Sequence, residues 1–193
     1  MRLFYALPTG EEDRSYLERW QACLAPRYRR AGRVYRENFH LTLRFLGGVD
    51  PMLLPRLEEA LEELAGNHQP FTLLPDRPGR FSGRRGETVY LGFSRTPAPL
   101  TDVYRELAGL LEPLGYPVTT EPFVPHITLL RNARLREDGP GQEPDCPSLR
   151  QIMISRICLM ESVSTPEGVR YREVVCGHLG GEVPQKSRRG RQE

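Results

Sequence analysis

The sequence predicts an α+β fold made of two similar lobes. Segments with apolar residues at helical spacing alternate along the chain with short apolar segments that favour strands. A frame of histidine, any residue, threonine and leucine occurs twice, at 40–43 and at 126–129. Each frame has an amphipathic helix near it, so we expect each lobe to hold a sheet backed by helices. The 193 residues suit one bilobal domain, placed at 1–180, followed by a basic, disordered tail at 181–193.

The first half of the chain is expected to contain strands and two helices. Thr9 and Glu12 have the spacing of a capping box, and Asp50 followed by Pro51 is typical of a helix start. Leucines recur at helical spacing behind Pro51, with glutamates between them, which indicates an amphipathic helix. In order, the expected elements are a strand at 2–7, a helix from Thr9 to about Leu24, strands at 33–36 and 39–46 joined by a tight turn, and a helix from Pro51 to Gly66.

The second half repeats this alternation. Val103, Leu107 and Leu111 share one face of a predicted third helix, and "TPEG" is typical of a turn between two strands. Residues 137–147 are rich in Gly, Pro and acidic residues, which predicts a loop. In order, the expected elements are strands near 70–75 and 87–93, a helix from about Pro99 to Leu114, a strand in "PFVPHITLLR", a buried strand within 149–160 and a strand at 168–178 that pairs with it.

The composition argues against several classes of protein. A net charge of +2 is too small for a strongly basic nucleic-acid coat, and no apolar run approaches the roughly 20 residues of a membrane-spanning helix. The apolar part of "MRLFYALPTG" is too short for a signal peptide, which indicates a cytoplasmic protein. The chain has no CxxC, so we expect free thiols in a reducing compartment for all four cysteines, which are Cys23, Cys146, Cys158 and Cys176.

Each frame sorts its polar residues to one face of a strand, because residues i and i+2 point to the same side. His40, Thr42 and Arg44 are expected to share one face. His126 and Thr128 are expected to share the corresponding face of the second strand. The opposite faces are apolar and are expected to pack on helices; they carry Leu41, Leu43 and Phe45 in the first strand and Ile127 and Leu129 in the second.

Two imidazoles that face one another are suited to acid–base catalysis at a phosphate. One takes a proton from the attacking oxygen while the other gives a proton to the leaving oxygen, and the reference pKa of histidine, about 6.5, is near working pH. Threonine hydroxyls can bind phosphate oxygens, and an arginine can balance their charge. The frames lack the further ligands of a metal site, and the chain has neither a glycine-rich phosphate loop nor a G-x-S-x-G elbow. The pattern therefore favours phosphodiester cleavage without a metal or cofactor.

Two segments resemble the paired signatures of the 2H phosphoesterase superfamily. "ENFHLTLRFLGGV" and "PFVPHITLLR" are similar to its two His-x-Thr motifs, in the same order and at this separation. The opening "MRLFYALP" and the closing "LMESVSTPEGVRYREV" are similar to its first strand and last hairpin. The RNA 2′,3′-cyclic phosphodiesterases, also called 2′-5′ RNA ligases, share these features over nearly the whole chain. The resemblance implies two antiparallel sheets that face a central cleft, with helices on the outside.

The resemblance also implies hydrolysis of a terminal RNA 2′,3′-cyclic phosphate to a 2′-phosphomonoester, with reverse 2′-5′ ligation chemically allowed. Carried over by position, His40 is the proton donor to the leaving 3′-oxygen. His126 is the proton acceptor that activates water. Thr42 and Thr128 bind the phosphate.

Two arginines are further candidates for binding the phosphate. Arg131 stands where the family often has an arginine, and its place in the strand alternation requires a bulge or the strand's end to bring it to the face of His126. Arg44 stands where the family favours a basic residue. This sequence departs from the family pattern at Phe39, where a leucine is common, and in the 137–147 loop and the tail, which have no clear counterpart. These departures bear on how the protein reaches its substrate more than on the chemistry.

Other functions fit the same frames. The substrate could instead be a small cyclic nucleotide, such as an ADP-ribose cyclic phosphate, or a 2′-5′ oligonucleotide. A non-catalytic RNA-binding module is the alternative of a different class, and it has no need for a histidine pair. We expect RNA ends or nucleotides with a 2′,3′-cyclic phosphate as partners, no membrane contact, and a monomer.

Overall fold

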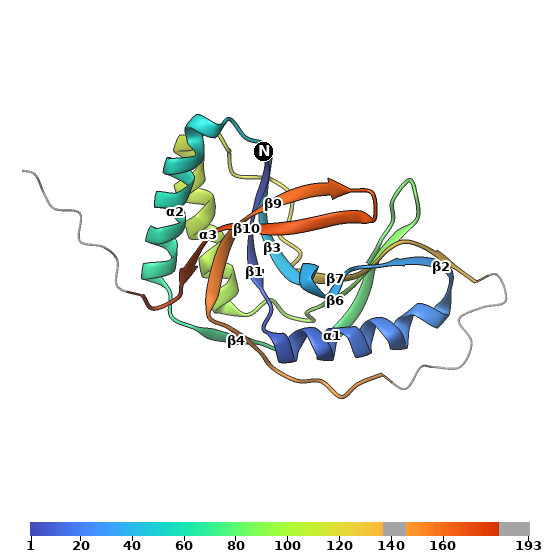
Figure 1. Ribbon diagram of the computed structural model, residues 1–193. Coiled ribbons are helices and arrows are strands. Elements are labelled where there is room, and N and C mark those ends of the chain that lie inside the picture. The colour runs from blue at the N-terminus through green and yellow to red at the C-terminus, as the bar shows by residue number, and fades with distance from the viewer. Residues whose placement is uncertain (137–145, 182–193) are drawn as a thin grey trace, which may run out of the picture.

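The computed structural model describes residues 1–136 and 146–181. Figure 1 shows the arrangement of its elements. The α-helices are α1 (Glu11–Leu24), α2 (Leu54–Asn67) and α3 (Ala98–Leu111). The strands are β1 (Arg2–Pro8), β2 (Tyr28–Arg33), β3 (His40–Gly48), β4 (Phe71–Leu73), β5 (Arg77–Phe81), β6 (Glu87–Gly92), β7 (His126–Leu135), β8 (Ile152–Ile154), β9 (Arg156–Thr165) and β10 (Gly168–His178).

The main sheet consists of two halves joined at one point. Its order is β10-β9-β1-β3-β7-β6-β5, with β2 paired to β7, and every pairing is antiparallel. Strands β3 and β7 meet through a single residue pair, Leu41 opposite Ile127. Strands β4 and β8 form a separate antiparallel pair. The predicted α+β fold with antiparallel sheets is confirmed.

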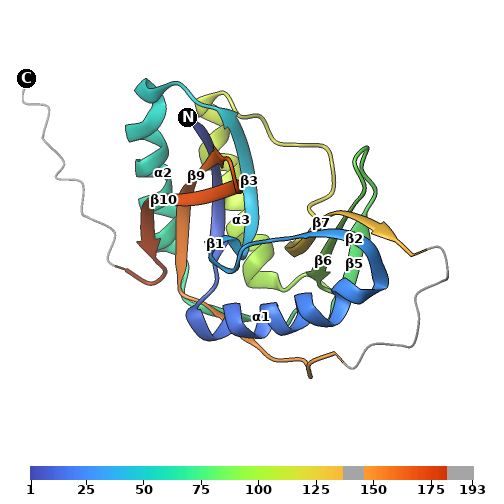
Figure 2. The same cartoon turned by 45° about the vertical axis from the view of Figure 1, so that its right-hand side comes forward.

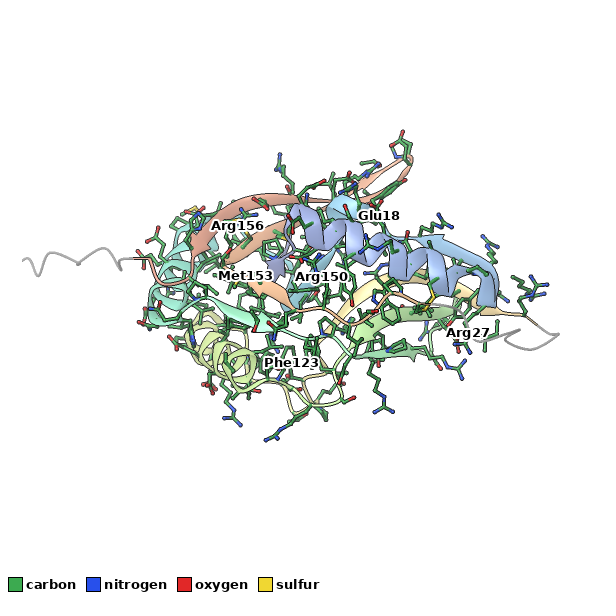
Figure 3. All side chains as sticks on the ribbon, turned by 90° about the horizontal axis from the view of Figure 1, so that it is seen from below. Glu18, Arg27, Phe123, Arg150, Met153 and Arg156 are labelled. Carbon is green, nitrogen blue, oxygen red and sulfur yellow. A yellow bond between two sulfur atoms is a disulfide. The ribbon has the colours of Figure 1, made fainter. Side chains whose placement is uncertain are left out.

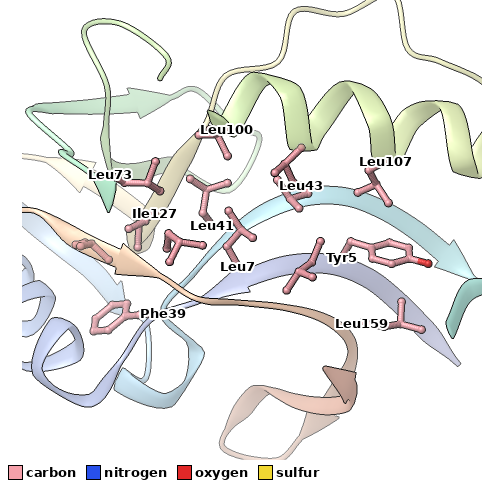
Figure 4. Packing of buried hydrophobic residues seen from close by; sticks show 14 of the residues in the cluster. Tyr5, Leu7, Phe39, Leu41, Leu43, Leu73, Leu100, Leu107, Ile127 and Leu159 are labelled. Carbon is pink, nitrogen blue, oxygen red and sulfur yellow. The ribbon is translucent and has the colours of Figure 1, made fainter. Parts of the chain in front are cut away.

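The helices lie over different halves of the sheet but share one hydrophobic core. Helices α2 and α3 pack on each other, and α2 packs on β9 and β10, whereas α1 packs on β7 (Figure 2). The apolar sides of β1 and β3 point toward α3, with Leu41 and Leu43 facing Leu100 and Leu107 (Figure 4). Tyr5 closes this core, since its hydroxyl donates a hydrogen bond to the backbone carbonyl of Leu57 in α2, at 2.7 Å. Because the apolar side of β3 faces α2 and α3, its polar side faces away from these helices.

Both predicted helix starts require adjustment. Gly10 caps α1, and the Thr9 hydroxyl donates to the carbonyl of Phe39 at 3.0 Å, so the capping-box prediction is wrong. The Thr9 hydroxyl bonds instead to Phe39, just before β3, because the buried carbonyl there needs a donor. Asp50 does cap a helical segment by accepting from the amide of Met52, but that segment is the 3₁₀ turn 51–53, which continues into α2.

The predicted hairpin between 33–36 and 39–46 is wrong. Strand β2 ends at Arg33 and pairs with β7, and the 3₁₀ turn Arg36–Asn38 leads the chain into β3. Strand β5 was not predicted, because Pro78 and Gly79 resemble a turn; both are tolerated in this strand, which lies at the edge of the sheet. The hairpin of β9 and β10 through "TPEG" is confirmed.

The prediction of free thiols is also wrong, since disulfides join Cys23 to Cys146 and Cys158 to Cys176. The second pair lies directly across β9 and β10, with the Cα atoms 4.1 Å apart. The predicted pairing of 168–178 with 149–160 already brings Cys158 and Cys176 near each other, whereas nothing in the sequence places Cys23 beside Cys146, 123 residues away. The first pair attaches the segment that begins at Cys146 to α1, where Arg150 also donates to Asp13 at 2.7 Å (Figure 3). Most of the expected 137–147 loop, and the tail beyond residue 181, lie outside the described residues.

No α-helix in the described ranges 1–136 and 146–181 has both the length and the apolar character needed to cross a bilayer.

Candidate active site

The Leu41–Ile127 pair brings the two His-x-Thr frames side by side. Leu41 and Ile127 are buried and point into the core. Because neighbours in a strand alternate, the flanking residues of both strands point to the opposite face of the sheet. Those residues are His40 and Thr42 on β3 and His126 and Thr128 on β7.

Both imidazoles are held by the same local device. The Nδ1 atom of His40 donates to the carbonyl of Asn38 at 2.7 Å, and the Nδ1 atom of His126 donates to the carbonyl of Val124 at 2.8 Å. A carbonyl only accepts, so in the neutral rings the proton is on Nδ1 and the Nε2 lone pair is left for chemistry. In β3 the hydroxyl of Thr42 lies 2.9 Å from Nε2 of His40. In both cases the carbonyl two residues before the histidine holds Nδ1, so Nε2 is the nitrogen available for catalysis.

The surroundings disfavour the charged form of both histidines. His40 is 7% exposed, and burial lowers its pKa to about 4 against the opposing hydrogen bond to Asn38. Burial also lowers the pKa of His126, although its ring is more accessible. The positive charge of Arg131 lowers the pKa of both histidines further. Arg131 therefore acts on the two rings together, and without a bound anion both are neutral at pH 7.

Each imidazole contacts two aromatic rings. The ring centroid of His40 lies 5.2 Å from that of Phe4 and 5.0 Å from that of Tyr171. These rings come from β1 and β10. The corresponding neighbours of His126 are Phe81 at 5.0 Å and Tyr90 at 5.1 Å, which come from β5 and β6. The two halves of the sheet thus support their histidines in the same way.

A bulge in β7 brings Arg131 to the face of His126. In the register with β6, Tyr90 is opposite Thr128 and Val89 is opposite Leu130, so Leu129 is an additional residue. Leu129 and Leu130 are both buried, which shifts the alternation by one position. The bulge that the sequence required for Arg131 is present.

Helix α1 stabilises this bulge through Gln21, which the sequence did not single out. The buried Nε2 of Gln21 donates to the carbonyl of Leu129 at 2.8 Å and to that of Val34 at 2.9 Å. The amide of Val34 also donates to the Leu129 carbonyl, at 3.1 Å. A buried glutamine on an amphipathic helix is a weak signal in a sequence, because its partners are backbone atoms far along the chain.

A second bulge moves Arg44 away from the histidines. Along β1 and β3, Ala6 is opposite Thr42 and Tyr5 is opposite Arg44, so Leu43 is the additional residue. Tyr5 points toward α2, and Arg44 follows it and donates to the carbonyl of Pro117 at 2.6 Å. The expectation that Arg44 shares the face of His40 is therefore wrong.

The same bulge also moves Phe45 from the core face, where it was expected, to the face of His40. It was expected in the core, but it is 66% exposed and its ring lies 5.6 Å from that of Phe4, which contacts His40. An arginine is thus lost from this face and an aromatic ring is gained. The period-two rule fails on both strands, and in each case one extra leucine is the cause.

Asn38 connects the His40 strand to β10. Its side-chain amide donates to the carbonyl of Val169 at 2.7 Å and accepts from the amide of Tyr171 at 3.1 Å. Tyr171 is one of the two rings against His40, so Asn38 fixes the imidazole through its backbone carbonyl and the aromatic neighbour through its side chain. Its burial at 6% exposure matches this role.

Gly79 makes room for Tyr90 beside His126. A Cβ atom at Gly79 would lie 2.5 Å from the Tyr90 ring, which also stacks on Phe81 at 4.4 Å. We expect the Gly79→Ala variant to displace Tyr90 and disturb His126, which should lower the catalytic turnover of the protein on its cyclic-phosphate substrate by up to about 10²-fold. The matched control is Gly109→Ala in α3, where a Cβ atom meets nothing within 4 Å. Equal turnover of both variants in a steady-state assay would contradict this role.

The described residues contain one group of possible metal ligands, and it lies apart from the histidines. It consists of Cys158, Glu173 and Cys176. The two sulfurs are bonded to each other, and Arg156 donates two hydrogen bonds to the Glu173 carboxylate at 3.2 Å each. These partners occupy the ligand atoms, so we assign no metal to the group.

Two curated relatives of this chain are named RNA 2′,3′-cyclic phosphodiesterases. A region of 135 residues, 68% of this chain, is 39% identical to the RNA 2′,3′-cyclic phosphodiesterase of Escherichia coli K12 and covers 72% of that protein. The RNA 2′,3′-cyclic phosphodiesterase of Geobacillus stearothermophilus is 28% identical over 88% of this chain, but the match spans only 51% of that relative. The chain thus spans about half the length of this relative.

The fold and the motifs point to the same family. The crystal structure of E. coli LigT in complex with 3′-AMP superimposes with a TM-score of 0.72 at 30% identity, over 93% of this chain and 98% of that one. The model of the 2′-5′ RNA ligase superfamily matches residues 9–139, a range that includes both His-x-Thr frames. With its paired histidines on adjoining strands and its backbone shared with a solved relative, the chain belongs to the 2′-5′ RNA ligase superfamily.

Proposed function

We propose that the protein hydrolyses the 2′,3′-cyclic phosphate at RNA ends to a 2′-phosphomonoester, without a metal. The observation that carries this proposal is the constellation of two anchored imidazoles and Arg131 on one sheet face, with Nδ1 of each ring bound to a backbone carbonyl. The names of the curated relatives and of the LigT complex support the substrate class.

In this mechanism His126 starts the reaction. Its Nδ1 proton is held by the carbonyl of Val124, so Nε2 is a free base at neutral pH. Because burial and Arg131 both keep the ring neutral, His126 is ready to accept a proton from water. The oxygen of that water attacks the phosphorus, and the proton moves to Nε2.

His40 completes the reaction by donating a proton to the leaving 3′-oxygen. Its low pKa means that the ring is neutral before the substrate arrives. The negative charge of the cyclic phosphate favours the imidazolium, so substrate binding recruits the proton that His40 later donates. The bond between phosphorus and the 3′-oxygen breaks, and the phosphate stays on the 2′-oxygen.

Arg131, Thr42 and Thr128 hold the phosphate in this proposal. Arg131 is exposed on the face that it shares with His126, and its charge balances the extra negative charge of the transition state. Thr42 and Thr128 flank the Leu41–Ile127 pair and offer hydroxyl donors to the phosphate oxygens. Arg44 is not included, because its guanidinium is bound to Pro117.

The test is turnover of an RNA ending in a 2′,3′-cyclic phosphate in the presence of EDTA. We expect full activity and a 2′-phosphate product, because protonation by His40 releases the 3′-oxygen and the proposed groups include no metal ligand set. The product is identified by its chromatographic mobility against authentic 2′- and 3′-monophosphates.

The controls separate the reaction from its alternatives. An RNA ending in a 3′-phosphate provides the blank, and adenosine 2′,3′-cyclic phosphate shows whether the RNA body is needed. A 3′-phosphate product would reverse the identity of the leaving oxygen. Loss of turnover in EDTA, restored by one added metal, would contradict the metal-free mechanism.

A further inference from the structure

A small apolar cluster, separate from the main core, lies on the face of the sheet that carries His40. It consists of Phe4, Ala6, Cys158 and Met160, with Tyr171 and Cys176 packed against them. Phe4 and Tyr171 are the two rings that contact the His40 imidazole. The disulfide between Cys158 and Cys176 therefore belongs to the same packed group as the aromatic support of His40.

One row of the sheet leads from this disulfide to the face of the histidines. In the strand register Cys176 is opposite Cys158, and Cys158 is opposite Ala6. Ala6 is in turn opposite Thr42, whose hydroxyl lies beside Nε2 of His40. Directly opposite residues of antiparallel strands point to the same side of the sheet. The sulfur of Cys158 is thus separated from β3 by a single strand, β1, on the side where the imidazole lies.

A bulge in β10 places Cys176 on this face together with Tyr171. Positions 173 and 175 are opposite consecutive residues of β9, so Val174 is an additional residue. Without it, Tyr171 and Cys176 would point to opposite sides of the sheet, because they are an odd number of positions apart. The bulge lets one strand supply both a ring against His40 and half of the disulfide.

Tyr171 lies between two attachments of β10. Toward the tip of the hairpin, the Asn38 side chain bonds to the backbone of Val169 and of Tyr171, at 2.7 and 3.1 Å. Toward its base, the disulfide joins β10 to β9. Among the described strands β10 pairs with β9 alone, at the edge of the main sheet (Figure 1). These side-chain attachments therefore decide how firmly Tyr171 is held against the imidazole.

We propose that the Cys158–Cys176 disulfide positions His40, and that its reduction by a dithiol lowers turnover. The inference rests on the proposed function, in which His40 donates a proton to the leaving oxygen. Two thiols occupy more room than one disulfide, because sulfur atoms that are not bonded keep a van der Waals separation. Phe4 and Ala6, which pack with Cys158, are at most 1% exposed, so the expansion displaces the rings that hold the imidazole.

The exchange is balanced in atoms and electrons. Cys176 is half-buried whereas Cys158 is 0% exposed, so a thiolate of the dithiol attacks Sγ of Cys176. The disulfide bond breaks, and the sulfur of Cys158 leaves and takes a proton. The second thiol of the reductant then attacks the mixed disulfide and releases Cys176 as a thiol. The protein gains two electrons and two protons, and the dithiol is oxidised to a disulfide.

The test uses two double variants that each keep one disulfide. Cys23→Ala with Cys146→Ala keeps the Cys158–Cys176 bond, whereas Cys158→Ala with Cys176→Ala keeps the other bond and is the control. Hydrolysis of adenosine 2′,3′-cyclic phosphate is measured before reduction with dithiothreitol, after it, and after reoxidation with oxidised glutathione. Thiol titration gives the redox state, and circular dichroism shows that each form is folded.

Reduction is expected to lower kcat of the first variant by about tenfold or more, since a misplacement of about 1 Å can cost 10²-fold, and reoxidation should restore it. The control variant should change by less than about twofold. When His40→Ala is added to the first variant, reduction should have no further effect, because the disulfide acts through His40. A merely structural role would lower turnover in that background as well.

The imidazole NMR signals of the wild type give a readout that needs no turnover and no cysteine variant. Reduction should shift the signals of His40 and leave those of His68, which bonds to Glu106 of α3, unchanged. Unchanged turnover and unchanged His40 signals after complete reduction would overturn the inference. So would an equal loss in the His40→Ala background, or thiols at 158 and 176 that titrate before reduction. A protein inactive on the cyclic phosphate in both redox states would instead overturn the proposed function.

Discussion

His40→Ala and His126→Ala are each expected to lower turnover of a 2′,3′-cyclic phosphate by at least roughly 10²- to 10⁴-fold, the usual contribution of general acid–base catalysis. Both side chains are held through Nδ1, so each substitution removes a positioned proton carrier while Arg131 and the threonines still bind the phosphate. Substrate binding should largely survive. The double variant should lose less than the sum of the two single effects if both groups act in one step.

A substrate with sulfur in place of the leaving 3′-oxygen distinguishes the two roles. A thiolate leaves without needing a proton, so this substrate should restore turnover to His40→Ala and leave His126→Ala slow. Rescue of His126→Ala instead would reverse the two roles and keep the reaction. His178→Ala, which removes an exposed histidine at the end of β10, is the control for the substitution itself. Near-normal turnover of either active-site variant would exclude the paired mechanism.

Arg131→Ala is expected to lower turnover by about 10²- to 10³-fold, the usual cost of removing one donor to a developing oxyanion. It should also move the pH optimum. The kcat/KM profile of the wild type should be bell-shaped and lie below pH 6.5, because its limbs report the lowered pKa values of His40 and His126. The charge of Arg131 disfavours both imidazolium forms, so its removal raises both pKa values and shifts the profile to higher pH.

The shift in pH optimum separates this role from a structural one. Arg134→Ala, on the same strand, is the control, because Arg134 is not among the groups that shift either pKa. Steady-state rates across the pH range for both variants give the comparison. A slow Arg131→Ala whose profile keeps the wild-type optimum would mean that the guanidinium does not act on the imidazoles.

The positions of the histidines could be predicted because the sequence repeats a local pattern. The frames His40–Leu43 and His126–Leu129 each alternate polar and apolar residues, and Leu41 and Ile127 do pack in the core. Alternation of this kind depends only on strand geometry, so it can be recognised without knowing the partners of a strand. The hairpin of β9 and β10 could be predicted from another local pattern, the turn residues "TPEG" between two candidate strands.

The positions of the arginines could not be predicted, because they depend on bulges. Leu43 and Leu129 are ordinary strand residues in the sequence, and only the facing strands β1 and β6 show that each is additional. One bulge removes Arg44 from the face of His40, and the other brings Arg131 to the face of His126. Disulfide pairing was missed for a similar reason, since Cys23 and Cys146 meet only through the fold.

The two halves of the main sheet are joined through one residue pair, Leu41 opposite Ile127, and this pair is the point about which they could rotate relative to each other. A sheet joined by many rungs resists rotation, whereas one rung lets two rigid bodies tilt against each other at little cost in backbone hydrogen bonds. The resistance to such a tilt comes instead from the side chains, because one continuous hydrophobic core under the junction includes residues of both α1 and α2. Substitutions that loosen the packing of Leu41 against Ile127 are therefore expected to change the distance between the two imidazoles on the opposite face of the sheet.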